Sequence, residues 1–342
     1  QAIAALSRRE SLPETLAGDV FDVVMRGEAS AAQLAALLMA LRVKGETPEE
    51  VAGAARALRR AMVTVPADLP HLIDTCGTGG GAVSTFNVST AAAFVAAGAG
   101  AAVAKHGNRS YTSKCGSADV LEALGVPIML EAPQAAAVLR AARVVFLFAP
   151  VYHPSMRHVG PVRKELGITS IMNLLGPLAN PAGVRRQVVG VADADRAPLL
   201  AGALAILGAE HALVVHGRVG IDEISPRGLT DVWEVRDGHV REWTIDPAPL
   251  GLEVPDLAGL RGGEPAENAV RVERLLGDGK DDTDGLAAVL LNAAAALYVA
   301  GIAGTIAQGV DAARAAIESG AARDALVMMK LASAAPGANT AG

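Results

Sequence analysis

The chain has 342 residues, of which 51% are hydrophobic and only 3% aromatic, so its core must consist mainly of Ala, Val, Leu and Ile. This length accommodates a large core and two domains, while the formal net charge of −6 argues against a nucleic-acid scaffold, which usually carries a basic surplus. The two cysteines lack CxxC spacing, which excludes a disulfide framework and favours a reducing, cytoplasmic setting.

The first part of the chain shows only helical periodicity. Apolar residues recur at helical spacing over residues 12–26 and 31–42. Residues 47–50 (Thr-Pro-Glu-Glu) then have the composition of a helix start, with Thr as N-cap and Glu three positions later. The predicted helix ends near residue 62, and a proline-containing linker follows. Residues 1–66 are therefore expected to form a small all-helical domain.

From residue 71 onward, short apolar strands alternate with helices, which predicts an α/β fold with a mostly parallel sheet flanked by helices. The strands are expected at residues 72–74, 101–105, 144–149, 187–191 and 212–216. The helices between them are expected at residues 90–98, 117–124, 133–142 and 196–207.

The remaining segments complete the expected organisation. Residues 231–245 are typical of a β-hairpin that turns at Asp-Gly, and helices return after residue 265. Residues 71–150 and 181–335 are expected to form the larger α/β domain, and the segment at about 153–180 is expected to return to the small helical domain.

Two apolar runs have the length of a membrane span. Residues 86–104 are mainly Ala and Gly between polar motifs, which favours a buried helix followed by a buried strand. Residues 286–307 are interrupted by Asn292, Tyr298 and Gly301. The first nine residues contain no long apolar segment, so we expect neither a signal peptide nor a membrane partner.

A glycine-rich loop at residues 77–81 (Gly-Thr-Gly-Gly-Gly) follows a predicted strand and precedes a helix that opens with Asn87, Ser89 and Thr90. Such glycines free backbone N–H groups to surround an anion, and the helix start adds its positive end. Neither the Gly-Lys-Ser/Thr of a P-loop nor the spacing of a dinucleotide fingerprint is present. A tight turn is the simpler interpretation, but the polar helix start favours binding of a phosphorylated small molecule.

A second polar cluster, Lys-His-Gly-Asn-Arg at residues 105–109, ends the next predicted strand. Lys105 and Arg109 are expected to supply charge for phosphates, and Asn108 a directional amide. His106 either orients a substrate or makes a structural hydrogen bond. Ser117 is placed to donate a hydrogen bond to a ligand or to cap the next helix.

Two further features concern charge. Asp222 and Glu223 follow a predicted strand and suit Mg²⁺, which takes one or two carboxylates together with phosphate oxygens; alone they would indicate a solvated acidic turn. Arg163 on a predicted helix has the geometry to bind a carboxylate through two hydrogen bonds, although a surface salt bridge is the alternative. The Gly-Pro-Leu-Ala-Asn-Pro turn at residues 176–181 is expected to form a rigid wall.

Together these motifs resemble those of the anthranilate phosphoribosyltransferases, in the same order along essentially the whole chain. The resemblance implies transfer of the 5-phosphoribosyl group from phosphoribosyl pyrophosphate (PRPP) to the amine of anthranilate, with release of pyrophosphate, in tryptophan biosynthesis. It also implies two Mg²⁺ ions, a PRPP-binding α/β domain, and a homodimer formed through the helical domains, without a nucleic-acid partner.

The resemblance further implies a role for each matching residue. The catalytic residues would be Lys105, His106 and Asn108. PRPP would be bound by Gly77, Thr78, Gly79, Gly80, Thr85, Asn87, Ser89, Thr90, Lys105 and Ser117. Anthranilate would be bound by Asn108 and Arg163, with His106, His153 and Gly176 near it. The Mg²⁺ ligands would be Ser89, Asp222 and Glu223.

One departure stands beside the phosphate site: family members usually carry Asp where this chain has Gly81. The substitution removes one negative charge, which predicts an altered Mg²⁺ optimum while pyrophosphate binding through backbone donors is kept.

Three alternatives stay open. A pyrimidine nucleoside phosphorylase has this architecture and also uses a glycine-rich anion loop with a lysine; a non-enzymatic paralogue would bind nucleic acid through a basic groove. The third is another aromatic amine as acceptor. The Lys-His-Gly-Asn run and the pair Asp222 and Glu223 favour the phosphoribosyltransferase, and Arg163 with Asn108 favours an acceptor that carries a carboxylate.

Overall fold

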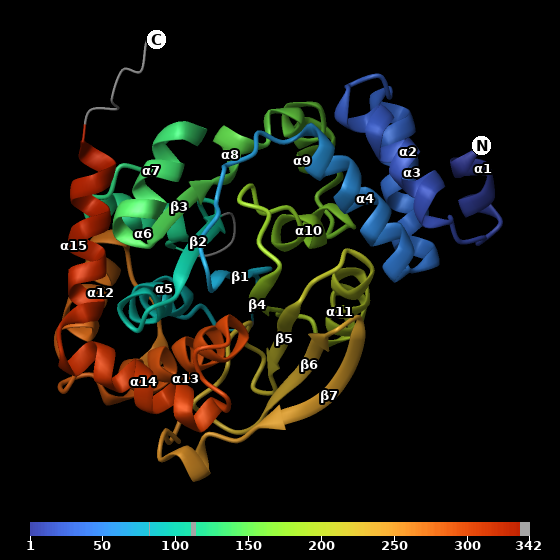
Figure 1. Cartoon of the computed structure of the whole chain (residues 1–342). Helices are drawn as coiled ribbons and strands as arrows, with labels where there is room; N and C mark the ends of the chain where they lie inside the picture. Colours follow the sequence, from blue (N-terminus) through green and yellow to red (C-terminus); the bar gives the residue numbers. More distant parts are fainter. Residues whose placement is uncertain (82, 111–113, 336–342) are drawn as a thin grey trace.

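One sheet of seven strands organises the chain, of which the computed structural model describes residues 1–81, 83–110 and 114–335. The strand order is β3-β2-β1-β4-β5-β6-β7 (Figure 1). The first five strands in this order are parallel, and β6 and β7 form an antiparallel hairpin beside β5. The mostly parallel sheet and the hairpin are therefore confirmed. The strands are β1 (Leu72–Gly77), β2 (Ala102–Gly107), β3 (Val144–Phe148), β4 (Arg186–Gly190), β5 (His211–Gly217), β6 (Thr230–Arg236) and β7 (His239–Ile245).

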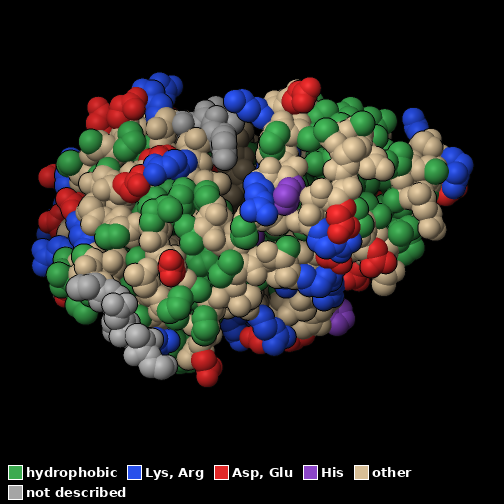
Figure 2. Space-filling model, turned by 90° about the horizontal axis from the view of Figure 1, so that it is seen from above, with side chains coloured by type: hydrophobic (Ala, Val, Ile, Leu, Met, Phe, Trp, Pro, Cys, Tyr) green, Lys and Arg blue, Asp and Glu red, His purple; other side chains and the backbone are tan. Residues whose placement is uncertain are grey.

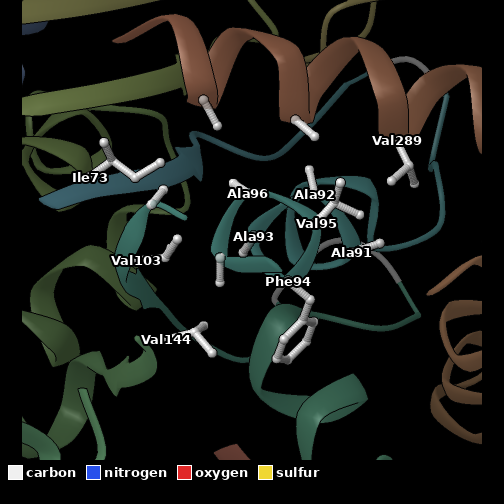
Figure 3. Close-up of a cluster of buried hydrophobic side chains, with 14 of the residues drawn as sticks. Ile73, Ala91, Ala92, Ala93, Phe94, Val95, Ala96, Val103, Val144 and Val289 are labelled. Atoms are coloured by element: carbon white, nitrogen blue, oxygen red, sulfur yellow. The ribbon is translucent and has the colours of Figure 1, made fainter. Parts of the chain in front are cut away.

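Most helices of the larger part pack on one face of this sheet. At their centre is α5, which is buried almost all round because its Ala-rich sequence lets neighbours approach closely. Figure 3 shows Val289 of α13 on one side of α5, and Ile73, Val103 and Val144 of the sheet on another. These helices are α5 (Val88–Gly98), α6 (Ser117–Ala123), α7 (Ala132–Ala142), α12 (Pro265–Gly277), α13 (Thr283–Ala300), α14 (Ile306–Glu318) and α15 (Ala321–Ala334).

The N-terminal part is helical, as predicted. Two of its helices begin with complete capping boxes, Ser30 with Gln33 and Thr47 with Glu50, in which side chains satisfy the first free backbone N–H groups. The second of these confirms the helix start predicted at residue 47. The helices are α1 (Ala2–Ser7), α2 (Glu14–Met25), α3 (Ala31–Lys44) and α4 (Pro48–Ala61).

The segment between β3 and β4 returns to these helices. It forms short helical turns whose apolar residues join the core of the N-terminal helices, with α9 against α3 and α10 against α4. Apart from the helix expected at Arg163, which is α9, these elements were not predicted, because each is shorter than two turns or interrupted by Gly and Pro. They are α8 (Ala149–Tyr152), η1 (Pro154–His158), α9 (Gly160–Leu166), α10 (Met172–Leu175) and η2 (Gly176–Leu178).

Two hydrophobic clusters stabilise the fold. The first contains α5, α13 and the sheet face that they cover. The second contains the N-terminal helices, α11 (Ala197–Ile206), and residues of β4 to β6 on the opposite sheet face. Because α11 contacts both α4 and the sheet, it attaches the helical part to the α/β part (Figure 1). Helices therefore lie on both faces of the sheet, as predicted.

Several predicted boundaries were wrong by a few residues. The helix expected at residues 12–26 begins at Glu14, because Pro13 is its N-cap with an extended ψ of 151° and restricts the residue before it; the N–H of Leu12 donates to the carboxylate of Glu50 at 2.8 Å. The strand expected at residues 72–74 extends to Gly77, because the chain continues to pair with β4. The helix expected from residue 90 begins at Val88.

One helix, α13, is long and apolar enough to cross a membrane by length and composition, among the residues described. However, 78% of its apolar window is buried inside the protein. Since α13 packs against α5, α14 and the sheet, its apolar composition is accounted for by its place in the core.

Candidate active site

The predicted site residues gather where the sheet topology changes direction. From β1 the chain proceeds outward to β2 and β3, whereas β4 and β5 lie on the other side of β1. In open α/β sheets, ligands bind beside the carboxyl ends of the strands at such a point. Seen from above, the surface is hollowed between the α/β part and the helical part, and Lys and Arg side chains lie along this hollow (Figure 2).

The glycine loop, residues 77–81, adopts backbone conformations that suit only glycine. Gly79 and Gly80 have φ values of +68° and +87°, and both are exposed. The N–H of Thr78 donates to the carbonyl of Gly190 at 2.8 Å, which attaches the loop to β4. A Cβ atom on Gly77 would lie 2.9 Å from Oδ2 of Asp222, so glycine here permits the close approach of the acidic turn.

Asp222 contacts the glycine loop, whereas Glu223 lies beside the start of α5, near the backbone of Ser89 and the charge of Lys105. The N–H of Gly79 donates to Oδ2 of Asp222 at 2.9 Å. Burial, together with the neighbouring Asp222 charge, raises the pKa of Glu223 to about 8, and burial also raises the pKa of Asp222. Two carboxylates that resist ionisation at this place would be stabilised by a cation.

The donor set fits Mg²⁺ only with help from a ligand. Carboxylate and hydroxyl oxygens are the hard donors that Mg²⁺ prefers. The described residues contain no group of three or more His, Cys, Asp or Glu that would hold a metal by themselves. Asp222 and Glu223, and separately Ser89, therefore offer oxygen ligands for ions that phosphate oxygens and water would complete.

Lys105 lies beneath this region as a buried cation. Its Nζ donates to the carbonyl of Thr75, and to Oγ of Ser89 at 3.1 Å. Only 4% of Lys105 is exposed, and burial lowers its pKa against the opposing charges of Asp74 and Glu223. The lysine therefore connects β2, β1 and the start of α5.

The other residues expected to bind PRPP lie along the start of α5. Asn87 precedes the helix, and its Nδ2 donates to the carbonyl of Cys115 at 3.2 Å. Thr85 pairs with Arg261 in an isolated β-bridge. Thr90 is buried, and its Oγ1 has no hydrogen-bond partner among the described residues. Asn87 makes no side-chain capping bond to α5; the N–H of Val88 donates to the carbonyl of Phe86, and the backbone of Ser89 lies against the carboxylate of Glu223.

At the second polar cluster one local prediction was wrong, and Arg109 has partners that the sequence did not indicate. Ser117 does not cap α6: Gly116 is the N-cap, and Ser117 Oγ donates to the carbonyl of Asn108 at 3.3 Å. Arg109 forms ion pairs with Asp119 and Glu122, at 2.9 and 2.5 Å, which offset the charge expected to bind phosphate. The sequence offered no sign of this, because the acidic partners lie a turn or more along α6.

His106, His153 and residues 176–180 form a structure that we call the histidine wall. His106 Nδ1 lies 3.2 Å from the carbonyl of Gly176, and His106 Nε2 lies 3.1 Å from His153 Nε2. Because a carbonyl only accepts hydrogen bonds, Nδ1 of His106 must carry the proton, and His153 must donate to Nε2. Burial, with the neighbouring His153, lowers the pKa of His106 to about 3, and burial lowers that of His153 to about 4. Both imidazoles are therefore neutral.

Asn108 and Arg163 flank this wall in the sequence. Asn108 follows β2, and its Oδ1 accepts from the N–H of Arg109 at 2.8 Å, which leaves its Nδ2 group as the donor. Arg163 is half-buried on α9, four residues before Gly167 ends that helix.

The sequence analysis missed the role of two buried polar residues beside the wall. Asp74, which is fully buried on β1, accepts from Asn180 Nδ2 at 2.7 Å and from the N–H of His106 at 3.1 Å. Burial raises the pKa of Asp74 to about 6, against the charge of Lys105 and these two hydrogen bonds. The sequence signal that could have indicated this role is the carboxylate of Asp74 within a predicted buried strand.

Two family models cover most of the chain. The model described as the glycosyl transferase family, helical bundle domain, matches residues 1–62. The model described as the glycosyl transferase family, a/b domain, matches residues 69–323.

Curated and solved relatives agree with these models. Anthranilate phosphoribosyltransferase of Chloroflexus aggregans is 51% identical over 330 residues, which is 96% of each chain. The crystal structure of anthranilate phosphoribosyltransferase from Thermus thermophilus is similar with a TM-score of 0.91 at 42% identity, over 97% of this chain and 99% of that one. The Saccharomyces cerevisiae enzyme in complex with PRPP and Mg is similar with a TM-score of 0.89 at 30% identity, over 97% and 96%.

Proposed function

The chain belongs to the anthranilate phosphoribosyltransferase family of glycosyltransferases, and on that premise we propose that it transfers the 5-phosphoribosyl group of PRPP to the amine of anthranilate. The bond from C1′ to pyrophosphate breaks, a bond from C1′ to nitrogen forms, and the amine loses one proton. The observation that supports this best is the glycine loop held against Asp222 at the end of β1, with Glu223 next to Asp222 and the start of α5. It combines backbone donors for a pyrophosphate with oxygen ligands for the cation that accompanies it.

On the donor side, leaving pyrophosphate must have its charge neutralised. The N–H of Gly80 in the exposed loop and the positive end of α5 would favour the phosphate oxygens, whereas the N–H groups of Thr78 and Gly79 already donate to Gly190 and Asp222. Asn87, Ser89 and Thr90 on that helix, Thr85 before it, and Ser117 on α6 would contact the same ligand. Lys105 supplies a positive charge fixed between β1 and α5.

A bound Mg²⁺ would supply charge stabilisation for the pyrophosphate as it leaves. We propose two sites, one that includes Ser89 and one that includes Asp222 and Glu223. The S. cerevisiae relative was crystallised with PRPP and Mg, which supports magnesium as the metal. The raised pKa values of Asp222 and Glu223 support a cation at the second site.

On the acceptor side, positioning is the main requirement. The aromatic amine of anthranilate is largely neutral near pH 7, so it needs little help from a base. We propose that Arg163 binds the carboxylate and Asn108 donates to the acceptor, beside His106, His153 and Gly176. Holding the amine against C1′ accounts for much of the rate in a loose displacement of this kind.

We also propose a division into domains and a dimer. Residues 1–66 with about 153–180 would form the helical domain, and residues 71–150 with 181–335 the PRPP-binding domain. The exposed face of α3 carries Met39, which is 37% exposed, and Val43, which is 68% exposed. An apolar stripe on a helix that is also buried on its other face supports a homodimer through the helical domains. Light scattering of Val43→Asp, expected to be monomeric, tests this.

Two free cysteines, Cys76 and Cys115, support a reducing compartment. We therefore propose a cytoplasmic location, as for an enzyme of amino-acid biosynthesis.

The reaction is tested by the loss of anthranilate fluorescence on addition of PRPP and Mg²⁺. We expect rapid loss that requires all three components. Arg163→Ala should raise the anthranilate KM by about 100-fold, the scale of a lost charge-assisted pair, whereas Lys164→Ala on the exposed side of α9 should not.

Two results of this assay would contradict the proposed reaction in different ways. Tight PRPP binding without fluorescence loss would indicate a different amine acceptor. An absence of PRPP binding would contradict the proposal, and phosphate-dependent cleavage of thymidine would then identify a nucleoside phosphorylase.

A further inference from the structure

The backbone pairing between β1 and β2 ends before the site is reached. The two strands are in register only at Leu72 with Ala102 and at Ile73 with Val103. From Asp74 onward, β1 pairs with β4 instead. The backbone groups of β2 that would face β1 therefore need other partners, since a buried N–H or C=O without one is costly.

Two side chains supply those partners. Asp74 Oδ1 accepts from the N–H of His106 at 3.1 Å, and Asn180 Nδ2 donates to the carbonyl of Ala104 at 2.7 Å. Asn180 Nδ2 also donates to Asp74 Oδ2 at 2.7 Å, and its Oδ1 accepts from the N–H of Ala182 at 2.8 Å. Asp74 and Asn180 thus provide the hydrogen bonds that backbone pairing between β1 and β2 does not make here. They also connect a third segment, residues 176–182, to these two strands.

This arrangement fixes His106 at both its backbone and its ring. The backbone N–H is held by Asp74, and ring Nδ1 donates to the carbonyl of Gly176 at 3.2 Å. The turn at residues 176–180 is likewise hydrogen-bonded at both ends. Gly176 contacts His106, and Asn180 contacts Asp74. Both ring nitrogens of His106 have partners within the protein, because its Nε2 faces His153. The geometry therefore favours a positioning role for His106 over direct proton transfer.

We propose that Asp74 and Asn180 are positioning residues of the acceptor site, which hold the His106 end of β2 and the turn at residues 176–180 as one unit. The inference rests on the proposed function for its kinetic consequence. Neither residue faces the glycine loop: Asp74 and Asn180 contact β2 and the turn, whereas the loop is held by Gly190 and Asp222. Loss of either should therefore affect the acceptor more than PRPP, since Asp74 acts on the PRPP side through its charge near Lys105 and Asn180 contacts β2, Asp74 and its own turn.

The test uses Asp74→Asn, which changes one atom of the side chain. An amide at this position cannot accept both hydrogen bonds, so either the His106 N–H or the Asn180 amide loses its partner. We expect kcat/KM for anthranilate to fall by about tenfold or more, as for a hydrogen bond to a buried charge. The calorimetric Kd for PRPP with Mg²⁺ should change less than the acceptor kcat/KM, because Lys105, whose charge lies near Asp74, keeps its hydrogen bonds to Thr75 and Ser89.

The matched control is Glu234→Gln. Glu234 is also buried, at 3% exposure, and accepts hydrogen bonds from His211, Arg241, Trp243 and Tyr298 on the far side of the sheet. It should lower the melting temperature and leave both kinetic constants as in wild type. If Asp74→Asn lowers PRPP affinity and acceptor kcat/KM in parallel, or changes neither, the inference is wrong.

Two further measurements cover the remaining outcomes. Should Asp74→Asn fail to fold, Asn180→Ala must show the same separation of acceptor and PRPP effects. Should the wild type not consume anthranilate at all, the proposed function fails, and the backbone amide signal of His106 in NMR spectra decides the inference by itself. It should be protected from hydrogen exchange in wild type and lose that protection in Asp74→Asn; unchanged protection would overturn it.

Discussion

The glycine loop is exposed and contacts Asp222, which with its neighbour Glu223 has a raised pKa, whereas the histidine wall is buried except at Gly176 and its polar groups largely have partners within the protein. The first region has carboxylates that a bound cation would stabilise. The second has little left to satisfy before a ligand arrives. Both lie at the carboxyl ends of β1 and β2, so the difference comes from which side chains follow the strands, not from their place in the fold.

The difference indicates that one region of this molecule binds the first substrate and the other positions the second. Charged groups that lack partners in the free protein lower its stability against unfolding. A ligand that supplies those partners raises the stability again when it binds. A rigid wall instead lowers the entropy lost when the second substrate is oriented. The following changes either sharpen this contrast or remove it, in order of decreasing expected effect.

Glu223→Gln should have the largest effect and should act oppositely on activity and stability. Activity should fall by about 100-fold or more, as when an electrostatic group at a leaving anion is removed. The folded-state pKa of Glu223 is raised to about 8 from 4.5, so its stabilising contribution is present below pH 4.5 and is lost as the pH rises through 8. The glutamine variant keeps that contribution, so above pH 8, without metal, its melting temperature should exceed that of wild type.

The comparison for that variant is Glu234→Gln, in the structural cluster of β6. Burial opposes ionisation of Glu234, but hydrogen bonds from Arg241, Tyr298 and His211 outweigh it and lower its pKa. Its contribution is therefore present above pH 4.5 and is lost as the pH falls. Glu234→Gln should be less stable than wild type at pH 8. A melting temperature for Glu223→Gln that also falls would contradict the contrast.

Gly80→Ala should have an intermediate effect on PRPP. With φ at +87°, alanine costs about 1–2 kcal/mol of backbone strain, and a loop that relaxes this strain would misdirect its N–H groups. We expect the KM for PRPP to rise by about tenfold. Gly125→Ala, at φ +81° and away from the site, should lose similar stability with unchanged kinetics. Equal kinetics for both variants would show that the loop conformation does not matter.

Gly81→Asp should have the smallest effect. Its Cβ would lie 3.2 Å from the carbonyl of Gly220 and 3.5 Å from Oδ1 of Asp222, so the carboxylate would add negative charge beside Asp222. We expect the Mg²⁺ concentration for half-maximal rate to shift by about threefold, as for a partly exposed charge, with little change in PRPP affinity. A Mg²⁺ profile identical to that of wild type would show that this position is electrostatically silent.

The glycine loop could be predicted from the sequence because its information is local. The glycines, the polar start of α5 and the strand before them are contiguous, and their order alone indicates an anion site. The alternation of strands and helices was predictable for the same reason. The family resemblance then supplied roles for individual residues that no local pattern gives.

The histidine wall could not be predicted in the same way. Asp74 and Asn180 are 106 residues apart in the sequence. No residue near either one indicates that the backbone pairing of β1 with β2 ends at Ile73 and Val103. The ion pairs of Arg109 were hidden because helix packing, not spacing, decides which acids face it. Short elements such as α8 and α10 lack enough turns to show a period.

Amide hydrogen exchange, measured on the free protein and after addition of PRPP with Mg²⁺ and then of anthranilate, tests the contrast most directly. The amides of Gly80 and Gly81 should exchange fast in the free protein and become protected when PRPP and Mg²⁺ bind, whereas those of Thr78 and Gly79 already donate to Gly190 and Asp222. The amides of His106 and Ala182, which already donate to Asp74 and Asn180, should be protected from the start and change little. Fast exchange at His106 or Ala182 in the free protein, with protection gained only on anthranilate binding, would contradict a preformed wall.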